Sequence, residues 1–136
     1  MRNLLIVLLT LLSSSFLMGQ FSDPGFESWS VEDGYSDLTG WQTGNAISHS
    51  LTNQTAVERS TDARTGESAL RLKVIDHPLS RINGMTWTNV PINDLPTELK
   101  GWYKFDAPGA SVWSVEVVTL DKDGMPLGIG RRALRE

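Results

Sequence analysis

Apolar and polar residues alternate along several short segments of the chain, and glycine, proline, asparagine and aspartate separate these segments. The alternation is clearest in residues 69–75, ALRLKVI, and in residues 111–120, SVWSVEVVTL. Successive side chains of a strand point to opposite faces, so this period of two predicts strands. After residue 20 no segment sustains the spacing of apolar residues that a long helix requires. The chain is therefore predicted to be all-β.

Shorter segments of similar character predict further strands at residues 26–30, 55–60, 85–90 and 97–105. The sequence DKDG at 121–124 is typical of a tight turn, so the residues after it are expected to form a hairpin with the strand before it. Many short strands without intervening helices favour a jelly-roll-like β-sandwich. No closing element follows the last predicted strand, so the sandwich is expected to lack its closing strand or strands.

Residues 1–19 have the composition of a secretory signal peptide, with a basic residue near the start and an apolar run over residues 4–12. This run is shorter than the roughly 20 apolar residues that a membrane-spanning helix needs. Cleavage is expected after Gly19, and residues 20–136 are expected to form a single β-sandwich domain that is incomplete at its C-terminus and has no membrane span. The protein is expected to be exported to the periplasm, the cell surface or the extracellular space.

Charge and cysteine content narrow the classes of partner. The chain carries 12 basic and 16 acidic residues and has no cysteine. Nucleic-acid binding depends on neutralising phosphates, so an acidic chain without a basic cluster is not expected to bind nucleic acid. An exported domain without cysteine has no disulfides, so its stability is expected to come from packing.

The segment LKGWYKF contains the main candidate binding surface. If it is a strand, Tyr103 and Phe105 face the core, and Trp102 lies on the outer face with Lys100 and Lys104. An exposed ring flanked by hydrogen-bond donors suits a sugar, because the apolar face of the sugar stacks on the ring while its hydroxyls bond to polar groups. The open alternative is that neighbouring loops or the lysine stems cover Trp102.

Other aromatic residues divide between core and loops. Trp113 shares its strand face with Val115 and is expected in the core. Trp41 and Trp29 lie in loop-rich segments and are further candidate ligand-binding residues, and these loops, with Tyr35, are the second place for a ligand.

Signs of catalysis are weak. His49 and His77 show no metal-ligand spacing, and the nucleophile pattern G-x-S-x-G does not occur. A glycoside hydrolase would need two carboxylates about 5 to 9.5 Å apart in a cleft. Such a cleft is hard to build from a short sandwich, so no enzyme is expected and a hydrolase is the least favoured alternative.

Four segments occur in a recognisable order: DPGFESWS, GWQTGN, STDARTGESALRLKV and LKGWYKFDAPG. Together they resemble the galactose-binding-like jelly-roll modules of exported Bacteroidetes proteins, including their carbohydrate-metabolism domain, and more distantly the N-terminal half of many carbohydrate-binding modules. The resemblance extends over residues 21–132. It implies a non-catalytic sandwich that binds glycans or serves as an accessory module.

The resemblance also implies a structural calcium ion. In related modules the glutamate of the FE motif and carbonyls of the loop before the SALRL strand hold this ion. Glu27 matches the glutamate, and Thr65 and Gly66 match the loop, whereas an aspartate in the last strand has no counterpart. Calcium takes six to eight oxygen ligands, so occupancy is expected to be weak. Glu27 is expected to lie close to the loop of residues 62–68.

A structural or protein-interaction module of the cell envelope is the alternative function. Missing strands would leave a sheet edge unpaired, and an unpaired edge favours strand addition and self-association.

Overall fold

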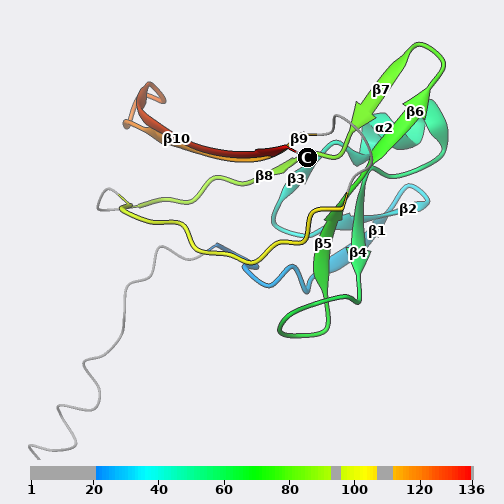
Figure 1. The fold of residues 1–136 in the computed structure, drawn as a ribbon, viewed down its shortest axis with the longest axis horizontal. Coiled ribbons are helices and arrows are strands. Elements are labelled where there is room, and N and C mark those ends of the chain that lie inside the picture. The colour runs from blue at the N-terminus through cyan, green and yellow to red at the C-terminus, as the bar shows by residue number, and fades with distance from the viewer. Residues whose placement is uncertain (1–20, 93–95, 107–111, 136) are drawn as a thin grey trace, which may run out of the picture. The chain divides into compact units, whose positions relative to one another are not determined.

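The computed structural model describes residues 21–92, 96–106 and 112–135, and the predicted signal peptide lies outside these residues. The chain divides into two compact units, residues 1–91 and 92–136. The interpretation of residues 20–136 as one domain stays a prediction. Ten strands and one short helix make up the regular structure of the described residues, so the chain is all-β as predicted (Figure 1). In the described part, no helix has the length and apolar character to cross a membrane.

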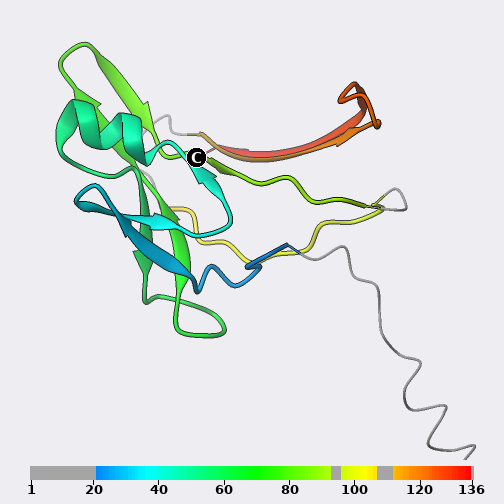
Figure 2. The same cartoon turned by 180° about the vertical axis from the view of Figure 1, so that it is seen from behind.

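The regular elements of the first unit are β1 (Trp29–Glu32), β2 (Tyr35–Leu38), β3 (Gln42–Thr43), α2 (Asn45–Thr52), β4 (Val57–Ser60), β5 (Ala69–Leu72), β6 (Val74–His77), β7 (Ser80–Asn83) and β8 (Thr86–Trp87). The strands form antiparallel pairs, β1 with β2, β3 with β8, β4 with β5 and β6 with β7 (Figures 1 and 2). Strand β2 also contacts α2, β3 and β4. The jelly-roll sandwich itself stays a prediction.

The β1–β2 hairpin turns at Asp33 and Gly34. Their φ angles of 41° and 90° are both positive, as a two-residue hairpin turn of the primed type requires. The strand predicted at 26–30 begins only at Trp29, because Phe26 has a φ of 57° and cannot extend it. The turn places Tyr35 as the first residue of β2.

The predicted strand ALRLKVI is interrupted at Lys73. Its N–H donates to the carbonyl of Ala56 at 2.9 Å, and its carbonyl accepts the N–H of Gly84 at 2.8 Å. A Cβ on Gly84 would lie 2.4 Å from the Ala56 carbonyl oxygen, so the three backbone segments can meet only with glycine there. The core-facing side changes at this point, because Ile75 is buried whereas Val74 is 49% exposed.

Helix α2 is a feature that the sequence pattern does not predict. It buries the polar residues Asn45 and Ser48 and exposes the apolar residues Ile47 and Leu51. Apolar periodicity, the usual signal of a helix, is therefore absent on its buried side. The helix ends at Asn53, which adopts the left-handed conformation with a φ of 58°.

The side-chain amide of Asn45 is fully buried and connects three elements. Its Nδ2 donates to the Val57 carbonyl at 2.9 Å, and its Oδ1 accepts the Val57 N–H at 2.9 Å. Nδ2 also lies 3.3 Å from the Ser36 carbonyl and 3.1 Å from Oδ1 of Asp37. The amide thus pairs with β4 as a neighbouring strand would, while holding α2 against β2. The buried apolar residues of the described chain are Leu38, Ala56, Val57 and Ile75.

The second unit contains the predicted hairpin of β9 (Val112–Leu120) and β10 (Pro126–Arg135). Oδ1 of Asp121 accepts the N–H groups of Asp123 and Met125, and Gly124 has a φ of 80°, which together close the turn. Exposure alternates along β9 as the sequence predicts. Trp113 lies on the less exposed face and stacks on Tyr103 with ring centroids 4.7 Å apart. It is half-buried rather than fully in a core.

Substitution of Asn45 by aspartate is expected to lower the free energy of unfolding by about 3 kcal/mol, because an oxygen would replace the donor that faces three acceptors. Asn89→Asp is the matched control, since Asn89 is exposed and lies outside any helix or strand. That change is expected to stay within about 0.5 kcal/mol. Urea unfolding followed by circular dichroism measures both, and equal losses would contradict the role of the buried amide.

Candidate functional site

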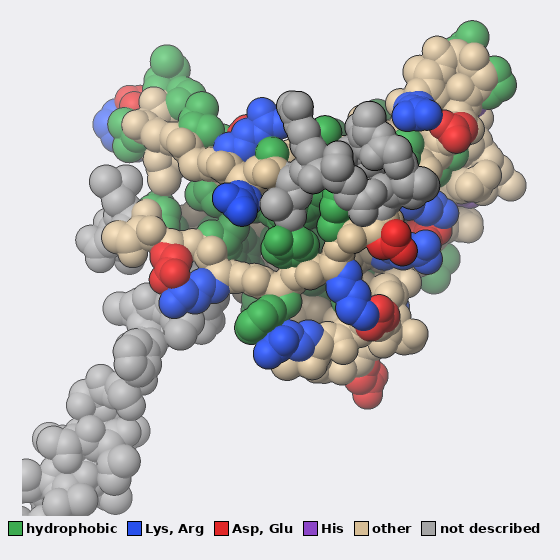
Figure 3. Space-filling model, in the orientation of Figure 1, with side chains coloured by type: hydrophobic (Ala, Val, Ile, Leu, Met, Phe, Trp, Pro, Cys, Tyr) green, Lys and Arg blue, Asp and Glu red, His purple; other side chains and the backbone are tan. Residues whose placement is uncertain are grey.

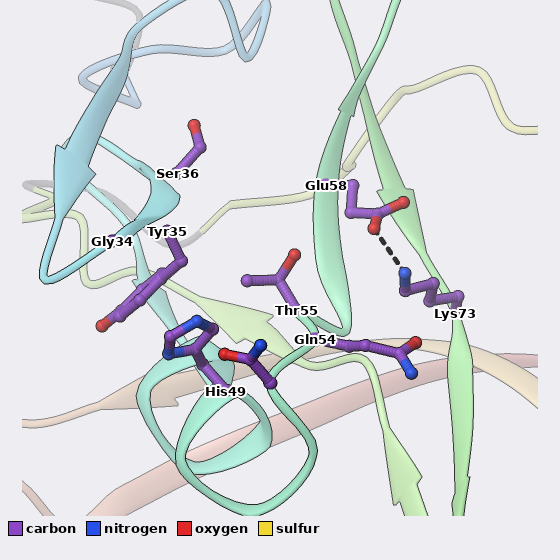
Figure 4. Close-up of a pocket in the computed structure, with 9 residues that line it drawn as sticks. Gly34, Tyr35, Ser36, His49, Gln54, Thr55, Glu58 and Lys73 are labelled. Carbon is purple, nitrogen blue, oxygen red and sulfur yellow. Dashed lines mark hydrogen bonds and ion pairs between the residues drawn. The ribbon is translucent and has the colours of Figure 1, made fainter.

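A polar hollow of about 340 Å³ opens in the first unit (Figure 4). Its lining comes from the β1–β2 turn, β2, α2, the turn after α2, β4 and the junction of β5 with β6. The lining residues are Gly34, Tyr35, Ser36, His49, Asn53, Gln54, Thr55, Glu58 and Lys73. The volume lies at the lower end of the range of about 300 to 1,000 Å³ that ligand pockets occupy.

Two rings form one side of the hollow. Tyr35 and His49 have ring centroids 5.0 Å apart and planes inclined by 36°. Both residues are half-buried, and the close-up shows the rings beside each other (Figure 4). The β1–β2 turn places Tyr35, and the buried side chains Asn45 and Ser48 of α2 place His49. Ordered elements therefore hold this aromatic side.

An ion pair between Glu58 and Lys73 forms the opposite side. In the close-up Thr55 lies between the ion pair and the two rings, and the Gln54 side chain extends below the ion pair (Figure 4). The side chains of Glu58 and Lys73 are only 31% and 28% exposed, so water and salt screen their attraction less than on an open surface. Their opposite charges cancel, and the hollow combines an aromatic face with donors and acceptors of hydrogen bonds.

The carboxylate content of the hollow bears on catalysis. Among the described residues that line it, Glu58 is the one carboxylate. Glycoside hydrolysis uses a pair of carboxyl groups, and the described lining supplies one of them.

The predicted surface around Trp102 lies in the second unit. Leu99, Lys100, Gly101 and Trp102 line a second hollow of about 430 Å³. Trp102 is 77% exposed, which confirms its predicted exposure. Lys100 forms an ion pair with Glu98, with Nζ and Oε2 2.9 Å apart.

The strand predicted at 97–105 is wrong, because the described residues 96–106 contain no strand. The predicted burial of Tyr103 is also wrong, since this residue is 55% exposed. Phe105 is half-buried, and Lys104 is exposed. Alternation assigns faces only when a strand belongs to a sheet, and this segment pairs with none of the described strands.

Trp29 and Trp41 lie in the first unit, and both have polar atoms engaged by the backbone. The indole N–H of Trp29 donates to the Phe26 carbonyl at 2.8 Å, and that of Trp41 donates to the Asp23 carbonyl at 3.2 Å. Trp41 also stacks on Phe21, with ring centroids 5.6 Å apart. These contacts give both rings a structural role near the start of the described chain, and their predicted ligand binding stays a prediction.

Glu27 lies against the loop of residues 62–68, as predicted. Its Oε1 accepts the N–H of Glu67 at 3.0 Å and the N–H of Ser68 at 3.2 Å. A Cβ on Gly66 would lie 2.0 Å from the same oxygen, and Gly66 has a positive φ of 72°. The carboxylate thus binds a turn of backbone donors, an arrangement that favours an anion.

These contacts do not assemble the ligands of a calcium site. N–H groups cannot bind a cation, and they occupy the oxygen of Glu27 that faces Gly66. The described residues include no group of three or more His, Cys, Asp or Glu side chains able to hold a metal ion. Thr65 and Gly66 would have to present their carbonyls in a different arrangement, so calcium binding there stays a prediction of weak occupancy.

No family model, curated protein or solved structure matches the chain. Function is therefore inferred from the geometry of the site and from the motifs of the sequence. Sequence reasoning named Tyr35 only as a second location and did not bring it together with Glu58 and Lys73. The Asp33–Gly34 pair was the available signal, because that dipeptide typically marks a hairpin turn and locates the start of β2.

Calcium is expected to raise the melting temperature by no more than about 2 °C relative to a chelator, because a weakly occupied site adds little stability. Differential scanning calorimetry in calcium and in chelator measures this shift. Glu27→Gln keeps the size of the side chain and should remove any part of the melting-temperature shift that calcium causes. A large rise in the native chain that Glu27→Gln abolishes would show that a strong calcium site exists.

Proposed function

We propose that this protein is a non-catalytic carbohydrate-binding module of an exported protein, and that the hollow beside Tyr35 is its binding site. One observation carries the proposal: an aromatic side formed by Tyr35 and His49 lies across a small hollow from the Glu58–Lys73 ion pair. The resemblance to galactose-binding-like modules, which rests on the order of four short motifs, supports the same class of ligand.

A sugar ring is amphipathic in a way that this lining matches. Its C–H faces are apolar and stack on aromatic rings, whereas each hydroxyl both donates and accepts hydrogen bonds. Tyr35 offers a ring, Gln54 and Thr55 offer both donors and acceptors, and the ion pair adds a strong donor and a strong acceptor. All of these groups belong to a hollow that a small ligand can enter.

The exposed ring of Trp102 supplies a second candidate contact for a glycan. Lys100 lines the same hollow, and Lys104 lies two residues after Trp102. Because this segment is irregular, it is less ordered for recognition than the hollow of the first unit, which is built on a hairpin, a helix and a strand. Tyr35 is therefore the principal ligand-binding residue in this proposal, and Trp102 is the subsidiary one.

Tyr35→Ala is expected to weaken binding of neutral monosaccharides about tenfold, which equals about 1.4 kcal/mol, because the stacking face is lost. Trp102→Ala is expected to change this affinity less than about threefold. Calorimetric titration with glucose, galactose and mannose measures both, after circular dichroism has shown that each variant is folded. A tenfold loss in Trp102→Ala with an unchanged Tyr35→Ala would place the site at LKGWYKF instead.

A structural or protein-interaction module is the second candidate, and the β9–β10 hairpin favours it. In the described part of the chain this sheet has two strands, so its outer edges have no strand partner there. Val118, Leu127 and Ile129 are 40%, 64% and 66% exposed, and Figure 3 shows hydrophobic side chains on the hairpin. Exposed apolar residues on an open edge favour pairing with another chain.

Self-association through this hairpin is expected to appear as a sedimentation coefficient that rises with protein concentration. Ile129→Lys should reduce the rise, because a charge on a strand at the edge disfavours pairing. Leu79→Lys is the control, since Leu79 is 89% exposed at the β6–β7 turn in the other unit. A monomer at every concentration, or equal effects of the two changes, would argue against this interface.

A further inference from the structure

We propose that the hollow selects uncharged sugars, and that two neighbouring hydroxyls of the ligand bridge the Glu58–Lys73 ion pair. This inference rests on the proposed function, because it names the class of sugar that the same site takes. It depends on the position of the ion pair in the lining and on its partial burial.

The ion pair offers complementary hydrogen-bonding groups side by side. A carboxylate only accepts hydrogen bonds and an ammonium only donates them. Neighbouring hydroxyls of a sugar can donate to Glu58 with one oxygen and accept from Lys73 with the other. Such a ligand adds charge-assisted hydrogen bonds without separating the two charges. A neutral ligand with adjacent hydroxyls is therefore matched to both partners at once.

A charged sugar is not matched in this way. A uronic acid attracted to Lys73 brings its own carboxylate close to Glu58, and an amino sugar attracted to Glu58 brings its ammonium close to Lys73. Either ligand competes for one partner and leaves the other beside a like charge. Because both side chains are about two-thirds buried, water compensates poorly for that loss.

The rest of the lining does not offset either charge. Ser36, Asn53, Gln54 and Thr55 are neutral, and Tyr35 and His49 are the other titratable groups that face the space. Asp37 is engaged elsewhere, because its Oδ1 accepts the hydroxyl of Thr43 and the amide of Asn45. Arg71 is the cross-strand partner of Glu58 but does not line the hollow. Among the lining residues, Glu58 and Lys73 therefore set most of the charge preference.

The test compares three ligands of one size: glucose, glucuronate and glucosamine. Titration of the full chain near neutral pH, followed by the amide NMR signals of residues 35, 54 and 73, gives each affinity. The native chain is expected to bind glucose at least about tenfold more tightly than either charged sugar. Glu58→Gln should shift the preference to glucuronate, and Lys73→Met should shift it to glucosamine.

Matched controls exist in the same unit. Asp76→Asn and Arg81→Met make equivalent changes to an ion pair whose side chains are 86% and 77% exposed, and neither residue lines the hollow. Both controls are expected to keep the native order of affinities. The amide spectrum of each variant shows whether it is folded.

Two kinds of negative result are distinguishable. If the native chain binds none of the three sugars, the proposed function and this inference both fail. If the native chain binds charged sugars as tightly as glucose, or if Glu58→Gln and Lys73→Met both keep the native order, the selection by the ion pair is overturned while carbohydrate binding stands.

Discussion

The buried amide of Asn45 is the interaction on which the first unit depends. It completes the hydrogen bonds of Val57 on the side where β4 pairs with no described strand, and it does so from a helix. An unsatisfied buried donor or acceptor costs about 1 to 3 kcal/mol. The contribution of this contact to the free energy of unfolding is therefore comparable to that of burying a large apolar side chain. The largest fully buried side chains of the described residues are Val57, Asn45 and Ser48, so polar side chains make up part of the interior of this unit.

The same network positions the candidate site. Asn45 holds α2 against β2 and β4, and these three elements carry His49, Tyr35 and Glu58. Lys73 reaches the hollow because its backbone is fixed between Ala56 and Gly84. The hydrogen bonds that satisfy the buried backbone groups thus position both sides of the hollow. A ligand that enters meets side chains whose backbones are already ordered, which lowers the entropy cost of binding.

Sequence patterns predicted the elements that local rules determine. The β9–β10 hairpin follows from alternation and a DKDG turn. The contact of Glu27 with the 62–68 loop joins distant residues, and it was expected from the family resemblance of the motifs rather than from local rules. Patterns did not reveal α2, because its buried side is polar, and they did not reveal the break at Lys73, because backbone contacts with distant residues cause it. Trp102 was correctly expected to be exposed, but the strand that was to explain its exposure does not form.

The two aromatic candidates differ in how their surroundings constrain them. Trp102 offers more open ring surface, yet an irregular segment fixes its orientation less firmly than a strand or helix would. Tyr35 offers less surface, but its position is set by a hairpin turn and by contact with His49. Affinity depends on preorganisation as well as on contact area. The exposed ring of Trp102 can therefore stack on many different ligands. Discrimination among sugars requires the ordered donors and acceptors that surround Tyr35.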